Sequence, residues 1–223
     1  MISIMPTKED LIRFWKEKNI VTNPILFGAF EAIPREAFIA PTLHHLAYED
    51  RPLPTIRKQS ISQPTTIMLM LEALELRKGH NVFELGAGVG YQAALLSKAV
   101  GPQGKCTTVD IIPELINATK ENFLKLNILN AHVIETDGGD GYNENAPYDR
   151  IIITAACPSI PQPLIDQLKE GGILVAPVGN LQSQTMVKGV KENGRLDLDF
   201  IGQFAFVPLR GKYGFKELEN MQE

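Results

Sequence analysis

The sequence lacks the residue patterns that several large classes of protein require. Its 223 residues include only two cysteines, Cys106 and Cys157, and these form no Cys-x-x-Cys pair. We therefore expect both thiols to fill a core rather than to react. The four histidines show no spacing typical of metal ligands, so the sequence predicts no metal site.

Long hydrophobic runs and concentrated positive charge are also missing. No apolar stretch approaches the roughly 20 residues that a membrane-spanning helix needs. The first residues carry acids and do not form the basic and then apolar regions of a secretion signal. The net charge is -4 and no block rich in Lys and Arg occurs, which argues against nucleic-acid binding. We expect a monomeric cytoplasmic protein that binds neither membranes nor nucleic acids.

The most informative stretch that is present is VFELGAGVGY, residues 82–91. An apolar run that stops at alternating glycines and continues into YQAALLSKAV indicates a buried strand, a tight turn and a helix. Glycines at such a turn let the backbone approach a ligand closely. Tyr91 occupies the position at which the dinucleotide fingerprint requires glycine, so the pattern argues against a nicotinamide or flavin cofactor.

Strands and helices alternate through most of the chain. We expect strands at 80–86, 104–110, 131–137, 148–156 and 172–179, and helices at 91–100, 113–126 and 161–171. Two further strands, at 184–192 and 195–209, flank Asn193-Gly194, a pair that favours a type I′ turn. This order predicts an α/β fold with a doubly wound, mostly parallel sheet and a C-terminal antiparallel hairpin.

The N-terminal part has a different pattern. Short helices are expected at 8–19 and 23–33, followed by a segment rich in proline, and the helix expected at 66–76 has apolar residues on most faces. We interpret the whole chain, 1–223, as one domain in which residues 1–60 form a small helical cap and residues 61–223 form the core.

Polar and glycine residues gather at the predicted strand ends, where ligands of open α/β sheets bind. These are Glu84, Gly86, Gly88, Gly90, Asp110, Asp137 and Gly138. Asp110 is placed to accept hydrogen bonds from ribose hydroxyls, and Asp137 from an exocyclic amine such as that of adenine. Structural roles remain open for the acids: Glu84 could bond backbone amides, Asp110 could cap a helix, and Asp137 could make an Asx turn.

Taken together, these segments resemble class I S-adenosylmethionine-dependent methyltransferases, and within them the protein L-isoaspartyl (D-aspartyl) O-methyltransferase family. The resemblance covers almost the whole chain. It rests on IPREAF, AYEDRPLP, QSISQP, FELGAGVGY, VDIIPEL, TDGGDGY, APYDRIIITAA, IPQPLIDQLKEGGILVAPVG and FVPLRGKYG. The combination of QSISQP with APYDRIIITAA and LIDQLKEGG is what resembles the isoaspartyl enzymes, whereas the glycine motif alone indicates only a methyltransferase.

The resemblance implies a Rossmann-like methyltransferase fold that binds S-adenosyl-L-methionine. The glycines at 86, 88 and 90 would pack under the methionine part of the cofactor. Asp110 would hold the ribose, and Asp137 with Gly138 would meet the adenine. The resemblance also implies that the segment from Gln59 through Ser60 to Ser62 lines both cofactor and substrate, with Ser62 at the position of the family's active-site serine.

The implied reaction needs few polar groups. The nucleophile would be the free α-carboxylate of an isoaspartyl residue, which is ionised at neutral pH and needs no general base. Catalysis is then mainly alignment and exclusion of water. Ser62 fits a hydrogen-bond donor that orients the carboxylate, because no Gly-x-Ser-x-Gly elbow marks it as a nucleophile. The alternative role for Ser62 is an N-terminal cap of the helix after Pro64.

The sequence departs from the family pattern in the loop that meets the substrate. Where family members often have GYGQTISAPH, this chain has IRKQSISQPT. Ile56 and Lys58 stand at glycine positions and restrict the backbone. Ser60 replaces threonine, and Thr65 replaces a histidine, which we expect to remove a polar group near the transfer centre.

The sequence as a whole predicts a carboxyl methyltransferase that esterifies isoaspartyl residues in damaged proteins and peptides and so initiates their repair. One alternative keeps fold and cofactor but changes the acceptor to a dedicated peptide carboxylate, a small molecule or an RNA. A second is a cofactor-binding module without catalysis, and an NAD-dependent oxidoreductase is a weaker third.

Overall fold

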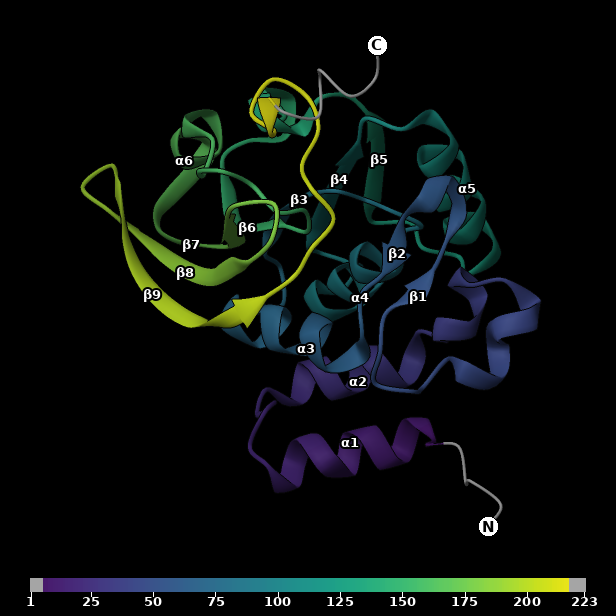
Figure 1. The fold of residues 1–223 in the computed structure, drawn as a ribbon. Coiled ribbons are helices and arrows are strands. Elements are labelled where there is room, and N and C mark those ends of the chain that lie inside the picture. Colours follow the sequence, from purple (N-terminus) through teal and green to yellow (C-terminus); the bar gives the residue numbers. More distant parts are fainter. Residues whose placement is uncertain (1–5, 217–223) are drawn as a thin grey trace.

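A mixed sheet of seven strands forms the centre of the protein, in the order β5-β4-β3-β6-β7-β8-β9 (Figure 1). The computed structural model describes residues 6–216. The strands are β3 (Asn81–Leu85), β4 (Lys105–Asp110), β5 (Ala131–Glu135), β6 (Tyr148–Ile153), β7 (Leu168–Gly179), β8 (Gln184–Glu192) and β9 (Arg195–Phe204). Neighbouring strands from β5 to β7 are parallel, whereas β8 and β9 pair antiparallel. The mostly parallel sheet with its C-terminal hairpin is confirmed.

Helices cover the sheet and extend beyond it at the N-terminal side. They are α1 (Lys8–Glu17), α2 (Pro24–Ala32), α3 (Pro64–Ala73), α4 (Tyr91–Val100), α5 (Pro113–Lys125) and α6 (Gln162–Gln167). A short antiparallel pair, β1 (Leu53–Pro54) and β2 (Ser60–Ile61), lies between α2 and α3 in the sequence. Among the described residues, no helix has the length and apolar character needed to cross a membrane.

The inner strands of the parallel part, β4, β3, β6 and β7, are buried on both faces, whereas β5 at the edge is only partly covered. In β6, Ile152 belongs to one hydrophobic cluster, while Ile151 and Ile153 belong to the other. The first cluster contains apolar residues of α2, α3, α4 and α5, and the second contains Leu164 of α6. Alternate side chains along each strand therefore contribute to cores on opposite faces.

The N-terminal helices are continuous with the larger core. Trp15 of α1 and Phe30 of α2 are fully buried, and their rings meet edge to face with centroids 4.7 Å apart. Both belong to the same cluster as Leu95 of α4. Figure 1 shows α1 outermost, with α2 between α1 and α3. The cap and one face of the sheet thus share one hydrophobic cluster, while the single-domain interpretation stays a prediction.

Several element boundaries differ from the sequence expectation, and the largest differences are in the C-terminal half. The helix predicted for 161–171 ends at Gln167, and β7 begins at Leu168, because Leu168 pairs with Tyr148 of β6 in the parallel ladder. Long-range strand pairing here overrides a local helical pattern. The last predicted strand also ends early, at Phe204. The turn between β8 and β9 has positive φ at Asn193 (52°) and Gly194 (77°), as a type I′ turn requires.

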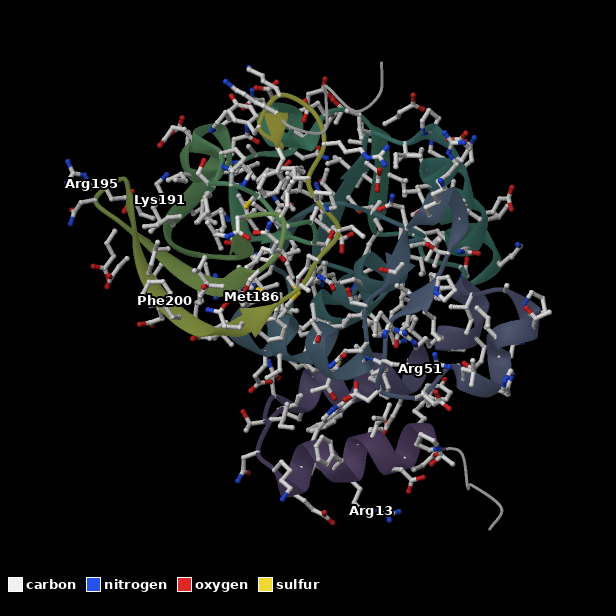
Figure 2. The ribbon with its side chains drawn as sticks, viewed as in Figure 1. Arg13, Arg51, Met186, Lys191, Arg195 and Phe200 are labelled. Atoms are coloured by element: carbon white, nitrogen blue, oxygen red, sulfur yellow. The ribbon has the colours of Figure 1, made fainter. Side chains whose placement is uncertain are left out.

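Strand β9 forms the outer edge of the sheet. Figure 2 shows Arg195 and Phe200 projecting from this edge, and Phe200 is 76% exposed. After Phe204 the chain leaves the sheet and crosses back over the strand ends (the yellow segment in Figure 1). This return brings C-terminal residues to the carboxyl ends of the parallel strands, the edge at which open α/β sheets generally bind ligands.

Candidate functional site

A cavity of about 910 Å³ opens at the carboxyl ends of the central strands. It lies where the strand order reverses: the chain runs from β3 outward to β4 and β5, and then returns to place β6 on the other side of β3. Leu85 ends β3, Asp110 ends β4 and Thr154 follows β6, and all three line the cavity. This topological switch point is where open α/β sheets bind their ligands.

The glycine turn after β3 forms one wall, and each of its glycines has a different constraint. All three have positive φ, at 101° for Gly86, 56° for Gly88 and 91° for Gly90. A Cβ on Gly86 would stand 2.2 Å from Thr154 Oγ1, and one on Gly90 would stand 2.7 Å from Thr119 Cγ2 of α5. A Cβ on Gly88 would meet open space. Gly88 thus leaves room in the cavity, whereas Gly90 is required for packing.

Asp110 holds the glycine turn and faces the cavity. Its Oδ2 accepts the Gly88 N–H at 3.0 Å, and its Oδ1 accepts the Ile112 N–H at 3.0 Å. Burial raises the pKa of this carboxyl, while the backbone donors oppose the shift. Helix α5 begins at Pro113 with Ile112 as N-cap and without a side-chain cap. Asp110 is therefore not the N-cap of this helix, and it lines the cavity.

Asp137 fastens the C-terminal segment over the strand ends. Its carboxylate accepts the Gly139 N–H at 3.0 Å, which is the Asx turn left open by the sequence, and also the Lys212 N–H at 2.8 Å. We call residues 207–215 the strap. The strap is further held by the Leu209 N–H, which donates to the Ala156 carbonyl at 2.7 Å. Residues 207–210 of the strap line the cavity.

Glu84 lies beneath the cavity and is not among the residues that line it. The side chain is fully buried in β3, and its Oε2 accepts the Thr108 hydroxyl of β4 at 2.5 Å. Its Oε1 has no hydrogen-bond partner in the described part of the chain. Burial, with a contribution from the charge of Asp110, raises the pKa of Glu84 to about 8. Glu84 therefore does not reach the cavity, and within the described residues it accepts no hydrogen bond from a backbone amide.

Ser62 stands on the wall between this cavity and a second cleft of about 1260 Å³. Helix α3 begins at Pro64, its N-cap is Gln63, and no side chain caps it. Ser62 is therefore not a helix cap. Its carbonyl accepts a hydrogen bond from Arg35 Nη1 at 2.8 Å, which fixes the peptide that carries the side chain.

The second cleft is continuous with the first. The two share Ser60, Ser62, Thr154 and Val207. The other residues of the second cleft are Pro52, Gln63, Thr66, Gln203, Phe204, Ala205 and Phe206. None of these side chains is ionisable. The site therefore consists of a cavity lined by Asp110, Asp137 and Arg210 and an uncharged cleft beside it.

The loop before Ser62 shows how one departure from the family pattern is accommodated. Arg57 and Lys58 have φ of 56° and 57°, in the left-handed region that favours glycine. Ile56 is not among the residues with positive φ. The backbone of Lys58 is thus strained at a position where the family has glycine. The backbone of Ile56, at the other such position, is not strained.

The prediction that Thr65, in place of a histidine, removes a polar group near the transfer centre was wrong. Thr65 does not line either cavity. It is buried in the first turn of α3, where its hydroxyl accepts the Trp15 indole N–H at 2.7 Å and its own N–H donates to Asp50 Oδ1 at 2.8 Å. The helix turns this position away from the site, so the threonine removes no polar group from it.

The comparison with protein families decides the relationship. The family model for protein-L-isoaspartate (D-aspartate) O-methyltransferase matches residues 6–214. The chain belongs to this family.

Individual isoaspartate methyltransferases are similar to this chain over nearly its full length. The chain is 42% identical over 209 residues to protein-L-isoaspartate O-methyltransferase of Methanoculleus marisnigri, covering 94% of both chains. It is 43% identical over 213 residues to that of Methanococcus maripaludis, covering 95% of this chain and 98% of the other.

Solved structures of isoaspartate methyltransferases share the fold. One matches with a TM-score of 0.85 at 30% identity, over 97% of this chain and 69% of the other. A Plasmodium falciparum protein, described as a putative member and solved with S-adenosyl-L-homocysteine, matches with a TM-score of 0.80 at 22% identity, over 92% and 99% of the two chains. The class I methyltransferase fold expected from the sequence is confirmed.

The cavity gathers most of the residues that the sequence singled out. Those lining it are Gln59, Ser60, Ser62, Gly86, Gly88, Asp110, Asp137 and Gly138. Glu84 and Gly90 lie outside it for the packing reasons given above. Thr154 and Tyr91 line the cavity as well and were not among the predicted site residues, although they belong to APYDRIIITAA and FELGAGVGY. Arg210, which had no predicted role, is brought to the cavity by the strap.

The residues present fit S-adenosylmethionine. Gly88 leaves open space in the cavity, and Asp110 offers a mostly buried carboxylate that could accept hydrogen bonds from a diol. No group of three or more metal-ligating side chains occurs within residues 6–216.

Proposed function

We propose that this chain is an S-adenosylmethionine-dependent carboxyl methyltransferase that esterifies the α-carboxylate of L-isoaspartyl residues in proteins and peptides. The observation that carries the proposal is the position of Ser62, on the wall shared by the strand-end cavity and the uncharged cleft. Membership of the isoaspartate methyltransferase family over residues 6–214 supports the same substrate. Esterification of an isoaspartyl residue is the first step of its repair.

In this proposal the strand-end cavity holds the cofactor. Asp110 accepts hydrogen bonds from the ribose hydroxyls, and the backbone of Gly86 and Gly88 lies against the methionine part. Gly138 and Asp137 lie beside the adenine, with the strap closing over them. The cofactor supplies a methyl group on a positively charged sulfur, and transfer to the carboxylate yields a methyl ester and S-adenosyl-L-homocysteine.

The second cleft holds the acceptor chain. An α-carboxylate is ionised at neutral pH, so the protein needs no base to activate it. Ser62 donates its hydroxyl proton in a hydrogen bond to one carboxylate oxygen and leaves the other directed toward the cofactor. Because the cleft offers no ionisable side chain, flanking residues of the acceptor bind mainly through backbone and apolar contacts. This suits substrates whose sequences vary.

The proposal is tested by following labelled methyl from S-adenosylmethionine to one peptide made in isoaspartyl and normal aspartyl forms. We expect a base-labile ester on the isoaspartyl form alone, and a kcat/KM reduced about 100-fold in Ser62→Ala, as for loss of one orienting hydrogen bond near the reacting atoms. Ser159→Ala, an exposed serine outside both cavities, is the control and should match wild type. Absence of ester on either peptide would refute the proposed acceptor.

The cofactor assignment is tested separately by binding. Asp110→Asn keeps the size of the side chain but removes its charge, and a hydrogen bond to a charged group contributes about 1.5–3 kcal/mol. We therefore expect the Kd for S-adenosyl-L-homocysteine, measured by calorimetry, to rise about 10- to 100-fold. Exposed Asp166, which does not line either cavity, provides the control Asp166→Asn. An unchanged Kd in Asp110→Asn would contradict the assignment.

A further inference from the structure

A buried arginine stands directly behind Ser62. Arg35, in the short 3-10 helix Arg35–Phe38 of the N-terminal segment, has no exposed surface. Its Nη1 donates to the Ser62 carbonyl at 2.8 Å, and its guanidinium carbon lies 5.4 Å from the centroid of the Tyr91 ring. Ser62 and Tyr91 both line the cofactor cavity. One buried cation therefore contacts two residues of the site without lining it.

The charge of Arg35 is not neutralised inside the protein. Its Nε and Nη2 have no hydrogen-bond partner, and no carboxylate in the described part of the chain forms an ion pair with it. Asp50 attracts it electrostatically, but Asp50 Oδ1 is bonded to the Thr65 N–H. Neighbouring Glu36 accepts the Tyr48 hydroxyl at 2.6 Å. A buried cation without a partner is costly, and folding alone gives no reason to keep it.

Burial does not remove this charge. It lowers the pKa of Arg35 to about 10, so the guanidinium remains protonated at neutral pH. The second cleft, where the acceptor carboxylate would bind, has no ionisable side chain of its own. Lys58 and Arg210 also lie near the site. Both are exposed to solvent, which weakens their electrostatic fields.

We propose that Arg35 is a positioning residue for the acceptor: it fixes the Ser62 peptide through its carbonyl and supplies the positive potential that draws the acceptor α-carboxylate toward the Ser62 hydroxyl. The inference rests on the proposed function, since it presumes an anionic acceptor. The bound anion would in turn compensate the unpaired guanidinium. The cofactor carries a carboxylate as well as cationic groups, so the charge test is made on the acceptor, with the cofactor product bound throughout.

This role predicts discrimination by charge. The probe is an isoaspartyl peptide with a free α-carboxylate, together with a twin whose α-carboxylate is a carboxamide. Binding of each to protein saturated with S-adenosyl-L-homocysteine is measured by calorimetry, because no transfer occurs in that complex. We expect wild type to prefer the carboxylate strongly. In Arg35→Met the ratio of the two Kd values should fall at least tenfold, equivalent to about 1.4 kcal/mol.

Controls separate this role from a structural one. Arg35→Met has a similar length and removes an unpaired buried charge, so stability to urea should be retained. Arg35→Gln provides a second neutral variant should the first not fold, and Arg35→Lys should keep most of the charge discrimination. Arg51→Met makes the same charge change at an arginine whose side chain is 52% exposed and pairs with Glu49. It should leave the ratio unchanged.

The outcomes distinguish this inference from the proposed function. If the wild type esterifies the isoaspartyl peptide but the neutral Arg35 variants bind both peptides more weakly by one common factor, Arg35 is only structural and the inference is overturned. A rise in the Kd for S-adenosyl-L-homocysteine equal to that for the peptide would overturn it as well. If the wild type does not esterify the isoaspartyl peptide, the proposed function fails and this inference fails with it.

Discussion

The indole N–H of Trp15 donates a 2.7 Å hydrogen bond to the hydroxyl of Thr65, 50 positions further along the chain. Both residues are buried, and the bond ties the first helix of the cap to the helix that follows the active-site loop. Trp15 is the only tryptophan of the protein. The residue that replaces the family's histidine is thus a structural link between cap and core.

Replacement of Thr65 by valine should affect stability and leave catalysis unchanged. The substitution preserves shape but leaves the buried indole N–H without an acceptor, which costs about 1–3 kcal/mol. Urea unfolding followed by the fluorescence of Trp15 measures this loss. Because Thr65 does not line either cavity, kcat/KM should stay within twofold of wild type. A large loss of activity with unchanged stability would contradict this placement.

Substitution by glycine should change the free energy of unfolding in opposite directions at Lys58 and Ile56, the two positions where the family has glycine. Lys58 has a φ of 57°, which costs a residue with a side chain roughly 1–2 kcal/mol, so Lys58→Gly should raise the free energy of unfolding by up to about 1 kcal/mol. Ile56 lacks a positive φ, and Ile56→Gly should lower it by about 0.5–1 kcal/mol through backbone entropy. Thermal unfolding of both variants measures the difference, and equal effects would refute it.

The raised pKa of Glu84 predicts a pH-dependent stability. The folded state raises this pKa from 4.5 to about 8, so it binds the proton more tightly than the unfolded state. The protonated carboxyl therefore favours folding most fully below about pH 4.5, and this contribution is lost as the pH rises toward 8. Each pKa unit corresponds to about 1.36 kcal/mol.

The variant Glu84→Gln removes this titration while keeping the size of the side chain and an acceptor for Thr108. Relative to wild type, its free energy of unfolding should rise by a few kcal/mol between pH 5 and pH 8. Urea unfolding at the two values measures the change. Glu121→Gln, at a side chain 71% exposed, should show no comparable trend. A flat difference between Glu84→Gln and wild type would show that Glu84 is not held protonated.

Closure of the strap should depend on Gly211. This glycine has a φ of 89°, and a Cβ there would stand 2.4 Å from Asp137 Oδ2. Gly211→Ala should displace the strap and raise the Kd for S-adenosyl-L-homocysteine at least tenfold. Gly194→Ala also places alanine at positive φ, 77°, but meets no atom within 4 Å. It should cost about 1 kcal/mol of stability and leave the Kd unchanged. Equal Kd values in the two variants would contradict a role of the strap in binding.

Local patterns were sufficient where the constraint itself is local. The glycines of FELGAGVGY have positive φ and mark the boundary between a strand and a turn. Asp110 is the last residue of the next strand in the sequence, β4. Such signals depend on a few neighbouring residues, so the sequence analysis located Gly88 and Asp110 at the cavity. Strand alternation likewise determined the sheet class.

Boundaries that depend on distant partners could not be derived in this way. Leu168 joins a strand because Tyr148 is there to pair with it, and Glu84 faces Thr108 inside the sheet although its neighbours Leu85 and Gly86 line the cavity. Side-chain direction alternates along a strand, and sequence position alone does not say which face a ligand occupies.

The sequence by itself determined the strand-end acid and glycines, because short contiguous motifs encode them, and it determined the fold class and the family through the order of such segments along the chain. Only the tertiary structure placed Arg35 behind Ser62, turned Thr65 toward Trp15 and brought the strap to Asp137. These contacts join segments far apart in the chain. Burial and hydrogen-bond satisfaction of the complete fold select them, and no local pattern specifies them.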